Sequence, residues 1–147
     1  MPGAAGTTRR RGKGTLLDLR FPVRVPDADV VYICAGANGA KACEGEQDSF
    51  LVNVDAPIDI ARQVFARGGF TVWISSMSVE WFAGGAYQRQ KLAAECVLRT
   101  MPSVGIVRAG RVTKDNVDDL CETLIRVGRN RVSGVTRWGS DEIAYQK

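Results

Sequence analysis

The sequence contains no histidine, and its cysteines include no Cys-x-x-Cys pair. Without histidine, Ser-His-Asp and Cys-His mechanisms are excluded, so any acid–base chemistry must use another residue type. The same two absences argue against a zinc site. We expect free thiols in a cytoplasmic protein, although disulfides remain open, and we predict that the first cysteine lies in the core. The four cysteines are Cys34, Cys43, Cys96 and Cys121.

Long apolar runs are also missing. No stretch approaches the ~20 residues that a membrane helix requires, and no apolar stretch of a secretory signal follows the basic N-terminus. With 147 residues, 45% hydrophobic and 24% charged, the chain has the length and composition of one globular domain with a sizeable core.

Basic residues are concentrated at the start of the chain. The net charge is +4, and six basic side chains fall within the first 25 residues. Residues 1–13 are small, polar and basic, and we expect them to form a disordered arm before a domain at 14–147 that opens with a short strand at 14–19. Nucleic-acid binding through this arm, with a steep salt dependence, is an alternative that the rest of the chain does not favour.

Apolar segments alternate with segments of helical periodicity. Strands are predicted at residues 29–35, 70–74 and 104–108, with a short one beginning at Gly134. Helices are predicted between them, at residues 47–67, 86–100 and 117–127. This order predicts an α/β fold, a Rossmann-like parallel sheet with flanking helices, in which ligands bind at the carboxyl ends of the strands.

The predicted core can be named from the same periodicity. One apolar face of the helix at 47–67 is predicted from residues at spacings of three and four, namely Phe50, Val54, Ile58, Ala61 and Phe65. Pro57 lies inside this helix and predicts a kink or a break. Trp73, Ile74 and Met77 are also predicted to be core residues.

A Tyr-x-x-x-Lys pair is the candidate for chemistry. Tyr87 and Lys91 are four residues apart, so on a helix their side chains share one face. The lysine ammonium would favour the phenolate and lower the tyrosine pKa from ~10 towards neutrality, which suits proton exchange with a hydroxyl or carbonyl. Ser76, at the end of the preceding strand, can hydrogen-bond the same substrate oxygen, and Ser75 is the neighbouring candidate.

Several segments in sequence order strengthen this interpretation. They are residues 29–36 (Asp-Val-Val-Tyr-Ile-Cys-Ala-Gly), 52–54 (Val-Asn-Val), 72–79 (Val-Trp-Ile-Ser-Ser-Met-Ser-Val), the Tyr87, Lys91 and Glu95 series, and 106–108 (Ile-Val-Arg). Over roughly residues 15–145 they resemble the extended short-chain dehydrogenase/reductase family, the group of nucleotide-sugar epimerases, dehydratases and reductases. Within it, the dTDP-4-dehydrorhamnose reductases are the most similar.

The resemblance implies a cofactor, NAD or NADP, and a nucleotide-sugar substrate, and it is compatible with a homo-oligomer. By resemblance, Ser76 is the catalytic serine, Tyr87 is the general acid/base, and Lys91 tunes Tyr87 and hydrogen-bonds the nicotinamide ribose. Further cofactor contacts are implied for the groove, the adenine side and the neighbouring helix, namely Ala35, Gly36, Asp18, Asn53 and Ser75.

The chain also departs from the family. Family members begin with a strand, a Gly-x-x-Gly-x-x-Gly loop and a helix that bind the cofactor pyrophosphate. Here only Gly3 and Gly6 echo that loop, and only two residues precede them. We therefore expect a partial NAD(P)-binding domain, lacking the first βαβ unit and the C-terminal substrate lobe. The alternative is a non-catalytic remnant of the same fold that serves as a binding or protein-interaction domain.

Overall fold

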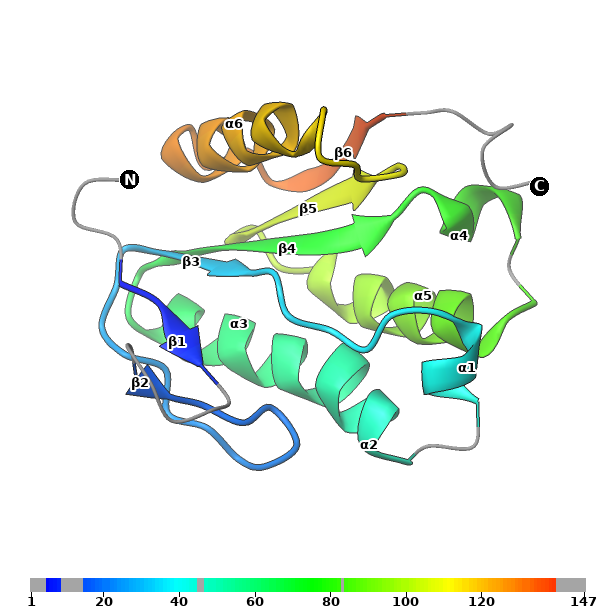
Figure 1. Cartoon of the computed structure of the whole chain (residues 1–147). Helices are drawn as coiled ribbons and strands as arrows, with labels where there is room; N and C mark the ends of the chain where they lie inside the picture. Colours follow the sequence, from blue (N-terminus) through cyan, green and yellow to red (C-terminus); the bar gives the residue numbers. More distant parts are fainter. Residues whose placement is uncertain (1–4, 9–14, 45–46, 83, 140–147) are drawn as a thin grey trace.

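A parallel sheet with helices on both faces forms the centre of the molecule (Figure 1). The computed structural model describes residues 5–8, 15–44, 47–82 and 84–139. Four strands lie side by side in chain order, all parallel: β3 (Val30–Ile33), β4 (Phe70–Ser76), β5 (Val104–Ala109) and β6 (Gly134–Trp138). The predicted Rossmann-like parallel sheet is confirmed.

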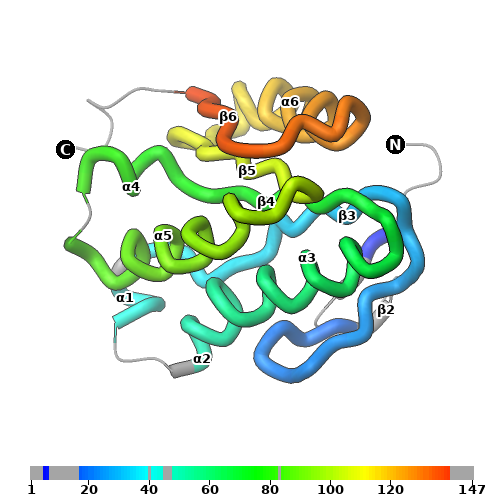
Figure 2. Tube along the Cα trace, turned by 180° about the vertical axis from the view of Figure 1, so that it is seen from behind, coloured from blue at the N-terminus to red at the C-terminus, as the bar shows by residue number. Residues whose placement is uncertain are grey.

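The helices form two layers, one on each side of the sheet (Figures 1 and 2). Helices α3 (Ala56–Ala66) and α5 (Ala86–Leu98) cover one face, and α6 (Val117–Arg129) covers the other. Each layer encloses its own apolar core. Trp73 and Ile106 lie in the core on the α3 and α5 side, whereas Val72 and Val107 lie in the core under α6. This alternation is that of strands buried on both faces.

The helix predicted at residues 47–67 changes its hydrogen-bonding pattern just before Pro57. It consists of α2 (Gln47–Phe50), a π-helical turn η1 (Leu51–Asp55) and α3, whose second residue is Pro57. Proline has no backbone N–H to donate, so the regular α-helical bonding pattern cannot run through this position. The backbone remains helical at Phe50, Asp55 and Ala56, so the predicted break does not occur and the irregularity before Pro57 is a π-helical turn.

The apolar face predicted for this helix was partly wrong. Phe50 and Phe65 are 45% and 55% exposed, whereas Val54 and Ala61 are buried as predicted. The other residues that α3 buries are Ala56, Pro57, Ile60 and Val64. The segment carries apolar side chains on more than one side, so periodicity alone could not select the stripe that faces the sheet.

Short elements complete the described chain. The segment predicted as a strand at residues 14–19 is extended only at β2 (Thr15–Leu16), which pairs in parallel with β1 (Thr7–Thr8) in a separate small sheet. Of the arm predicted at residues 1–13, residues 5–8 are described and contain β1, whereas 1–4 and 9–13 lie outside the described residues, as does the stretch 140–147. Helix α1 (Ala40–Cys43) lies between β3 and α2, and α4 (Ser78–Trp81) follows β4.

The core predictions for single residues were partly right. Trp73 and Met77 are 1% and 2% exposed, which confirms them as core residues, and Ile74 is half-buried. The prediction for Cys34 was wrong, because this residue is exposed. Within the described residues β3 is an outer strand of the sheet, so its end is covered on fewer sides than that of β4. Among these residues, no helix has the length and apolarity needed to cross a bilayer.

Candidate functional site

Six of the eight predicted site residues lie just after β3, at the end of β4 and on α5, whereas Asn53 lies in η1 and Asp18 follows β2. Parallel pairing sets Ser75 beside Arg108 and Ser76 beside Ala109, at the ends of β4 and β5. Helix α4 follows β4 directly, and α5 then returns beneath the sheet with Tyr87 in its first turn. In open parallel α/β sheets, ligands bind at the carboxyl edge of the sheet.

Lys91 is a charged group that is almost fully buried at this edge. Its side chain is 5% exposed, and its Nζ donates a hydrogen bond to the Ile74 carbonyl oxygen at 2.9 Å. The same nitrogen lies 4.6 Å from the Trp73 ring centroid and 5.6 Å from the Tyr87 ring centroid, both within cation–π range. Burial lowers the Lys91 pKa to about 8, opposed by Cys43 and Glu95. The ammonium form therefore still predominates at pH 7.

Gly36 and Asn53 adjoin this lysine. A Cβ placed on Gly36 would lie 3.1 Å from Asn53 Oδ1 and 3.8 Å from Lys91 Nζ, so the three residues converge. Asn53 is buried; its Oδ1 accepts from the Ala37 amide at 2.9 Å, and its Nδ2 donates to Gln90 Oε1 at 2.8 Å. Asn53 therefore fixes the chain after β3 against α5. Ala35, next to Gly36, is exposed at this rim.

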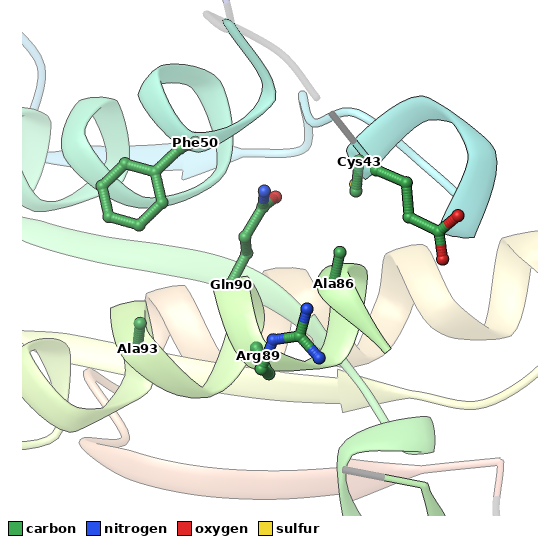
Figure 3. A pocket seen from close by; sticks show the side chains of 7 residues that line it. Cys43, Phe50, Ala86, Arg89, Gln90 and Ala93 are labelled. Atoms are coloured by element: carbon green, nitrogen blue, oxygen red, sulfur yellow. The ribbon is translucent and has the colours of Figure 1, made fainter. Parts of the chain in front are cut away.

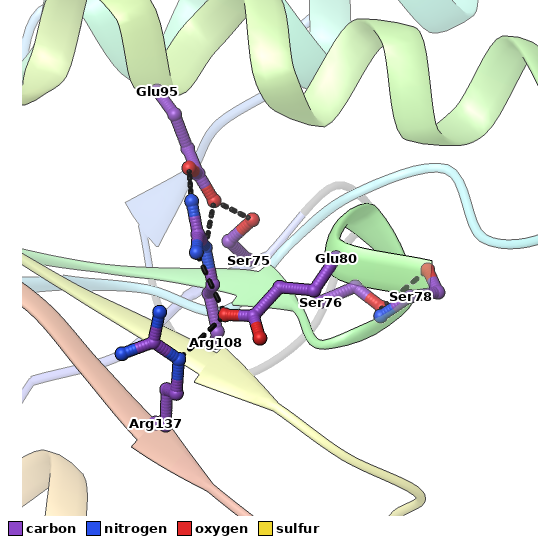
Figure 4. A network of polar contacts seen from close by, with 7 residues as sticks. All are labelled: Ser75, Ser76, Ser78, Glu80, Glu95, Arg108 and Arg137. Carbon is purple, nitrogen blue, oxygen red and sulfur yellow. Dashed lines mark hydrogen bonds and ion pairs between the residues drawn. The ribbon is translucent and has the colours of Figure 1, made fainter. Parts of the chain in front are cut away.

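The two serines have different surroundings (Figure 4). Ser75 is buried, and its Oγ donates to Glu95 Oε1 at 2.6 Å. Ser76 Oγ lies 2.8 Å from Ser78 Oγ and accepts from the Ser78 amide at 3.1 Å. Gln88 Nε2 in turn donates to Ser78 Oγ at 3.2 Å. The hydroxyl of Ser75 thus belongs to an ion-pair network, whereas Ser76 is linked through Ser78 to the neighbour of Tyr87.

An ion-pair network beside the serines was not predicted (Figure 4). Arg108 makes two bonds to Glu95, at 3.0 and 2.5 Å, and one to Glu80 at 2.8 Å. Glu80 also accepts from Arg137 Nε at 2.6 Å. Partial burial acts to raise the Glu80 pKa, but the bonds from the two arginines lower it overall. The sequence did contain one indication of this network, which is an arginine in an otherwise apolar strand. A buried charge requires a partner of opposite charge.

Asp18 lies on a different segment and has a partner of its own. Arg20 Nη2 donates to Asp18 Oδ2 at 2.6 Å, and Arg20 Nε contacts both carboxylate oxygens. The residues after Asp18 line a shallow depression with η1 and the start of α3, which includes Asp55 and Asp59. The structure therefore places the predicted adenine-side carboxylate in a local ion pair.

A cavity of about 500 Å³ lies between α5 and the α1–α2 segment (Figure 3). It is lined by Cys43, Glu44, Phe50, Ala86, Arg89, Gln90 and Ala93. The lining positions on α5 lie on a different side of the helix from Tyr87 and Lys91. Cys43 and Gln90, which line it, both accept from Asn53 Nδ2, so the cavity adjoins the residues beside Lys91.

The sheet and its two helical layers define a Rossmann-like fold. Three solved structures described as dTDP-4-dehydrorhamnose reductases share it. The protein from Clostridium acetobutylicum has a TM-score of 0.62 at 20% identity, over 75% of this chain and 55% of its own. The Bacillus anthracis protein, in complex with NADP, has a TM-score of 0.63 at 15% identity, over 76% and 56%.

The third structure, a hypothetical dTDP-4-dehydrorhamnose reductase from Sulfolobus tokodaii, has a TM-score of 0.61 at 16% identity, over 74% of this chain and 54% of its own. The chain thus spans about half the length of these structures. No protein-family model matches it, and no curated protein does.

The residues present fit one end of a nicotinamide cofactor. An ammonium has three N–H donors, and the Ile74 carbonyl takes one from Lys91, so donors remain for a ribose hydroxyl. Gly36 adds no side chain to the space beside Lys91. The pyrophosphate end differs, because the sequence has no strand followed by a Gly-x-x-Gly-x-x-Gly loop.

Proposed function

We propose that this chain is the Tyr-Lys half of an NAD(P)-dependent reductase that acts on a nucleotide sugar. The observation that supports this most is the buried Lys91 ammonium, held against the Tyr87 ring at the carboxyl edge of a parallel sheet. Placing a charged group at such low exposure costs free energy, and cation–π contact with two rings offsets part of it. Such an arrangement suits a site that needs a fixed positive charge.

In this proposal each residue has a separate task. Tyr87 gives a proton to the sugar oxygen, or takes it back in the reverse direction. Lys91 lies 5.6 Å from the Tyr87 ring centroid, and its positive charge favours the phenolate that remains after proton transfer. The Ser76 hydroxyl, held by Ser78, positions the same sugar oxygen. When bound, the reduced nicotinamide supplies the hydride to the sugar carbon.

The cofactor would contact the rim formed by Ala35, Gly36 and Asn53, with Lys91 donating to the ribose. Ser75 would contribute indirectly, since its hydroxyl bonds to Glu95. One structural neighbour is described in complex with NADP, so NADPH is the first cofactor to test. A cytoplasmic location stays a prediction.

A second candidate function is a non-catalytic remnant of the same fold that binds another protein. Two observations favour it. The sequence lacks the glycine-rich phosphate loop, and within the described residues β3 is an outer strand whose Val30, Val31 and Tyr32 are half-buried. Edge strands of this kind pair readily with other chains.

Replacing the phenol tests the catalytic proposal. NADPH oxidation is followed by absorbance with dTDP-4-dehydrorhamnose as substrate. Tyr87→Phe is expected to lower turnover by at least ~100-fold, because the proton donor is lost. Its melting temperature should change little, since Tyr87 is half-buried and loses one oxygen atom.

Tyr32→Phe is the matched control. Tyr32 packs its hydroxyl against Gly128 of α6, outside the candidate site, so this variant should keep full turnover. Full turnover by Tyr87→Phe would remove Tyr87 from the mechanism. Absence of turnover by the unmodified chain with both NADPH and NADH would favour the remnant.

A further inference from the structure

Two exposed cysteines lie where β3 and α6 meet near the carboxyl edge of the sheet. Cys34 follows the last residue of β3, and Cys121 lies in the first half of α6. Both side chains are exposed, whereas Cys43 is buried. The proposed reductase chemistry uses neither of them.

Strand alternation places the Cys34 side chain on the α6 side of the sheet. Val30 and Tyr32 pack against the core under α6, whereas Val31 and Ile33 belong to the core on the opposite side. Successive side chains of a strand point to opposite faces. Cys34, two residues beyond Tyr32, therefore shares its side and lies ~7 Å further towards the carboxyl edge.

Helix α6 presents Cys121 to the same region. Gly128 packs against Tyr32, since a Cβ on this glycine would lie within 3 Å of the tyrosine hydroxyl and its ring carbon. Cys121 is seven residues before Gly128, which is two turns, so both lie on one side of the helix about 10 Å apart. Helix α6 runs antiparallel to β3 (Figure 1). The step from Tyr32 to Cys34 and the step from Gly128 back to Cys121 therefore both lead towards the carboxyl edge of the sheet.

The electrostatics agree with this placement. Partial burial raises the pKa of the Cys34 thiol, and Cys121 raises it further. A contribution from Cys121 agrees with its placement on the same side of the sheet as Cys34, since Coulomb interactions decay with distance. Cys96, on α5, contributes no such effect.

We propose that Cys34 and Cys121 are a redox-active dithiol that closes into an intramolecular disulfide when it meets an oxidised low-molecular-weight disulfide such as glutathione disulfide. One cysteine thiolate attacks glutathione disulfide, forms a mixed disulfide and releases one glutathione. The second cysteine then attacks the protein sulfur of that mixed disulfide and releases the other glutathione. Two electrons pass from the dithiol to glutathione disulfide, and the two thiol protons end on the two glutathiones.

Formation of the disulfide between Cys34 and Cys121 would join the end of β3 covalently to α6. Cys34 directly precedes Ala35 and Gly36, the rim beside Lys91. The disulfide would therefore restrict the segment that the candidate site uses, although its formation does not depend on the proposed function. A pair at an exposed, outer strand is accessible to a small oxidant, unlike a buried structural cysteine.

The test is oxidation of the full chain with millimolar glutathione disulfide at pH 8.5, where more of Cys34 is thiolate. The products are alkylated, digested without reductant and mapped by mass spectrometry. The expected result is a peptide pair that joins Cys34 to Cys121 and an intact monomer lighter by about 2 Da. Repeating the reaction in denaturant should lower the yield of this pair, because the fold brings the sulfurs together.

Single variants identify the participants. Cys34→Ser and Cys121→Ser should each abolish the cross-link and leave a glutathione adduct on the remaining cysteine. Cys96→Ser removes another exposed thiol and should leave the cross-link unchanged. Glutathione adducts at both positions without a cross-link, disulfides between two copies through Cys34, or an unreactive Cys34 would each overturn the proposal.

Discussion

At the scale of single residues, the unusual feature is a charged lysine in an almost fully buried position. Lys91 is 5% exposed, and the Trp73 ring, the Tyr87 ring and the Ile74 carbonyl surround its ammonium. Burial disfavours the charged form, and this cause lowers its pKa from 10.5 to about 8. The folded protein therefore gives up this proton more readily than the unfolded chain does.

This shift predicts how stability depends on pH. Between pH 8 and 10.5 the unfolded chain keeps the Lys91 proton while the folded protein has lost it, so the free energy of unfolding rises with pH in this window. Relative to Lys91→Met, the unmodified protein should gain about 3 kcal/mol from pH 7 to pH 10.5. Urea unfolding of both proteins at several pH values measures the difference between their free energies of unfolding. The contributions of the other titrating groups cancel in this difference, because both proteins contain them. A difference that does not change with pH would contradict a buried, titrating Lys91.

Sequence spacing predicted some of these residues better than others. Tyr87 and Lys91 share a helix face because i and i+4 spacing is a property of any α-helix, and the structure brings their side chains together. The different surroundings of Ser75 and Ser76 depend on which face of β4 each occupies and on Glu95, twenty residues from Ser75. Short-range patterns do not contain such contacts. Cys34 was misplaced for a similar reason, since its exposure depends on the lateral order of strands.

At the scale of elements, the network around Arg108 connects the parts that carry the site. Arg108 on β5 bonds Glu95 on α5 and Glu80 on α4, and Arg137 on β6 also bonds Glu80. Glu95 is 1% exposed and holds Ser75 as well, whereas the Glu80 side chain is 24% exposed. The helix with Tyr87 and Lys91 is thereby fixed to the sheet by charge-assisted bonds.

Removing one partner of the buried pair should be strongly destabilising. Glu95→Gln leaves the Arg108 guanidinium without its main counter-charge, and we expect a loss of about 3 kcal/mol in the free energy of unfolding. Glu80→Gln is the matched control, and its more exposed carboxylate should cost less than about 1 kcal/mol. Denaturant titration of both variants gives the comparison. Equal effects would show that burial does not set the strength of this network.

The elements themselves were largely predictable. The four strands of the main sheet and the long helices have apolar patterns that last several residues, which is why their type could be assigned. The π-helical turn η1 and the four-residue helices α1 and α4 are too short for a periodic pattern. Their conformation depends on neighbours such as Asn53, whose bonds to Ala37 and Gln90 connect residues distant in sequence.

At the scale of the whole molecule, the fold covers about half the length of the solved reductases that it resembles. The described residues supply the Tyr-Lys helix and the rim beside the expected nicotinamide ribose. The alternation of strands and helices predicted this architecture, because each βα unit leaves its own apolar signature. How strongly a cofactor binds could not be predicted, since that affinity depends on phosphate contacts that the sequence does not provide in the usual form.

In the proposed function, Lys91 at the carboxyl edge of the sheet holds a nicotinamide cofactor. The most direct measurement is titration of the purified chain with NADPH by isothermal calorimetry, repeated with Lys91→Met. We predict saturable binding at millimolar NADPH or below for the unmodified chain, weakened at least about 10-fold in Lys91→Met by the loss of a charge-assisted hydrogen bond. Equal affinity in both proteins, or no binding at millimolar NADPH and NADH, would contradict it.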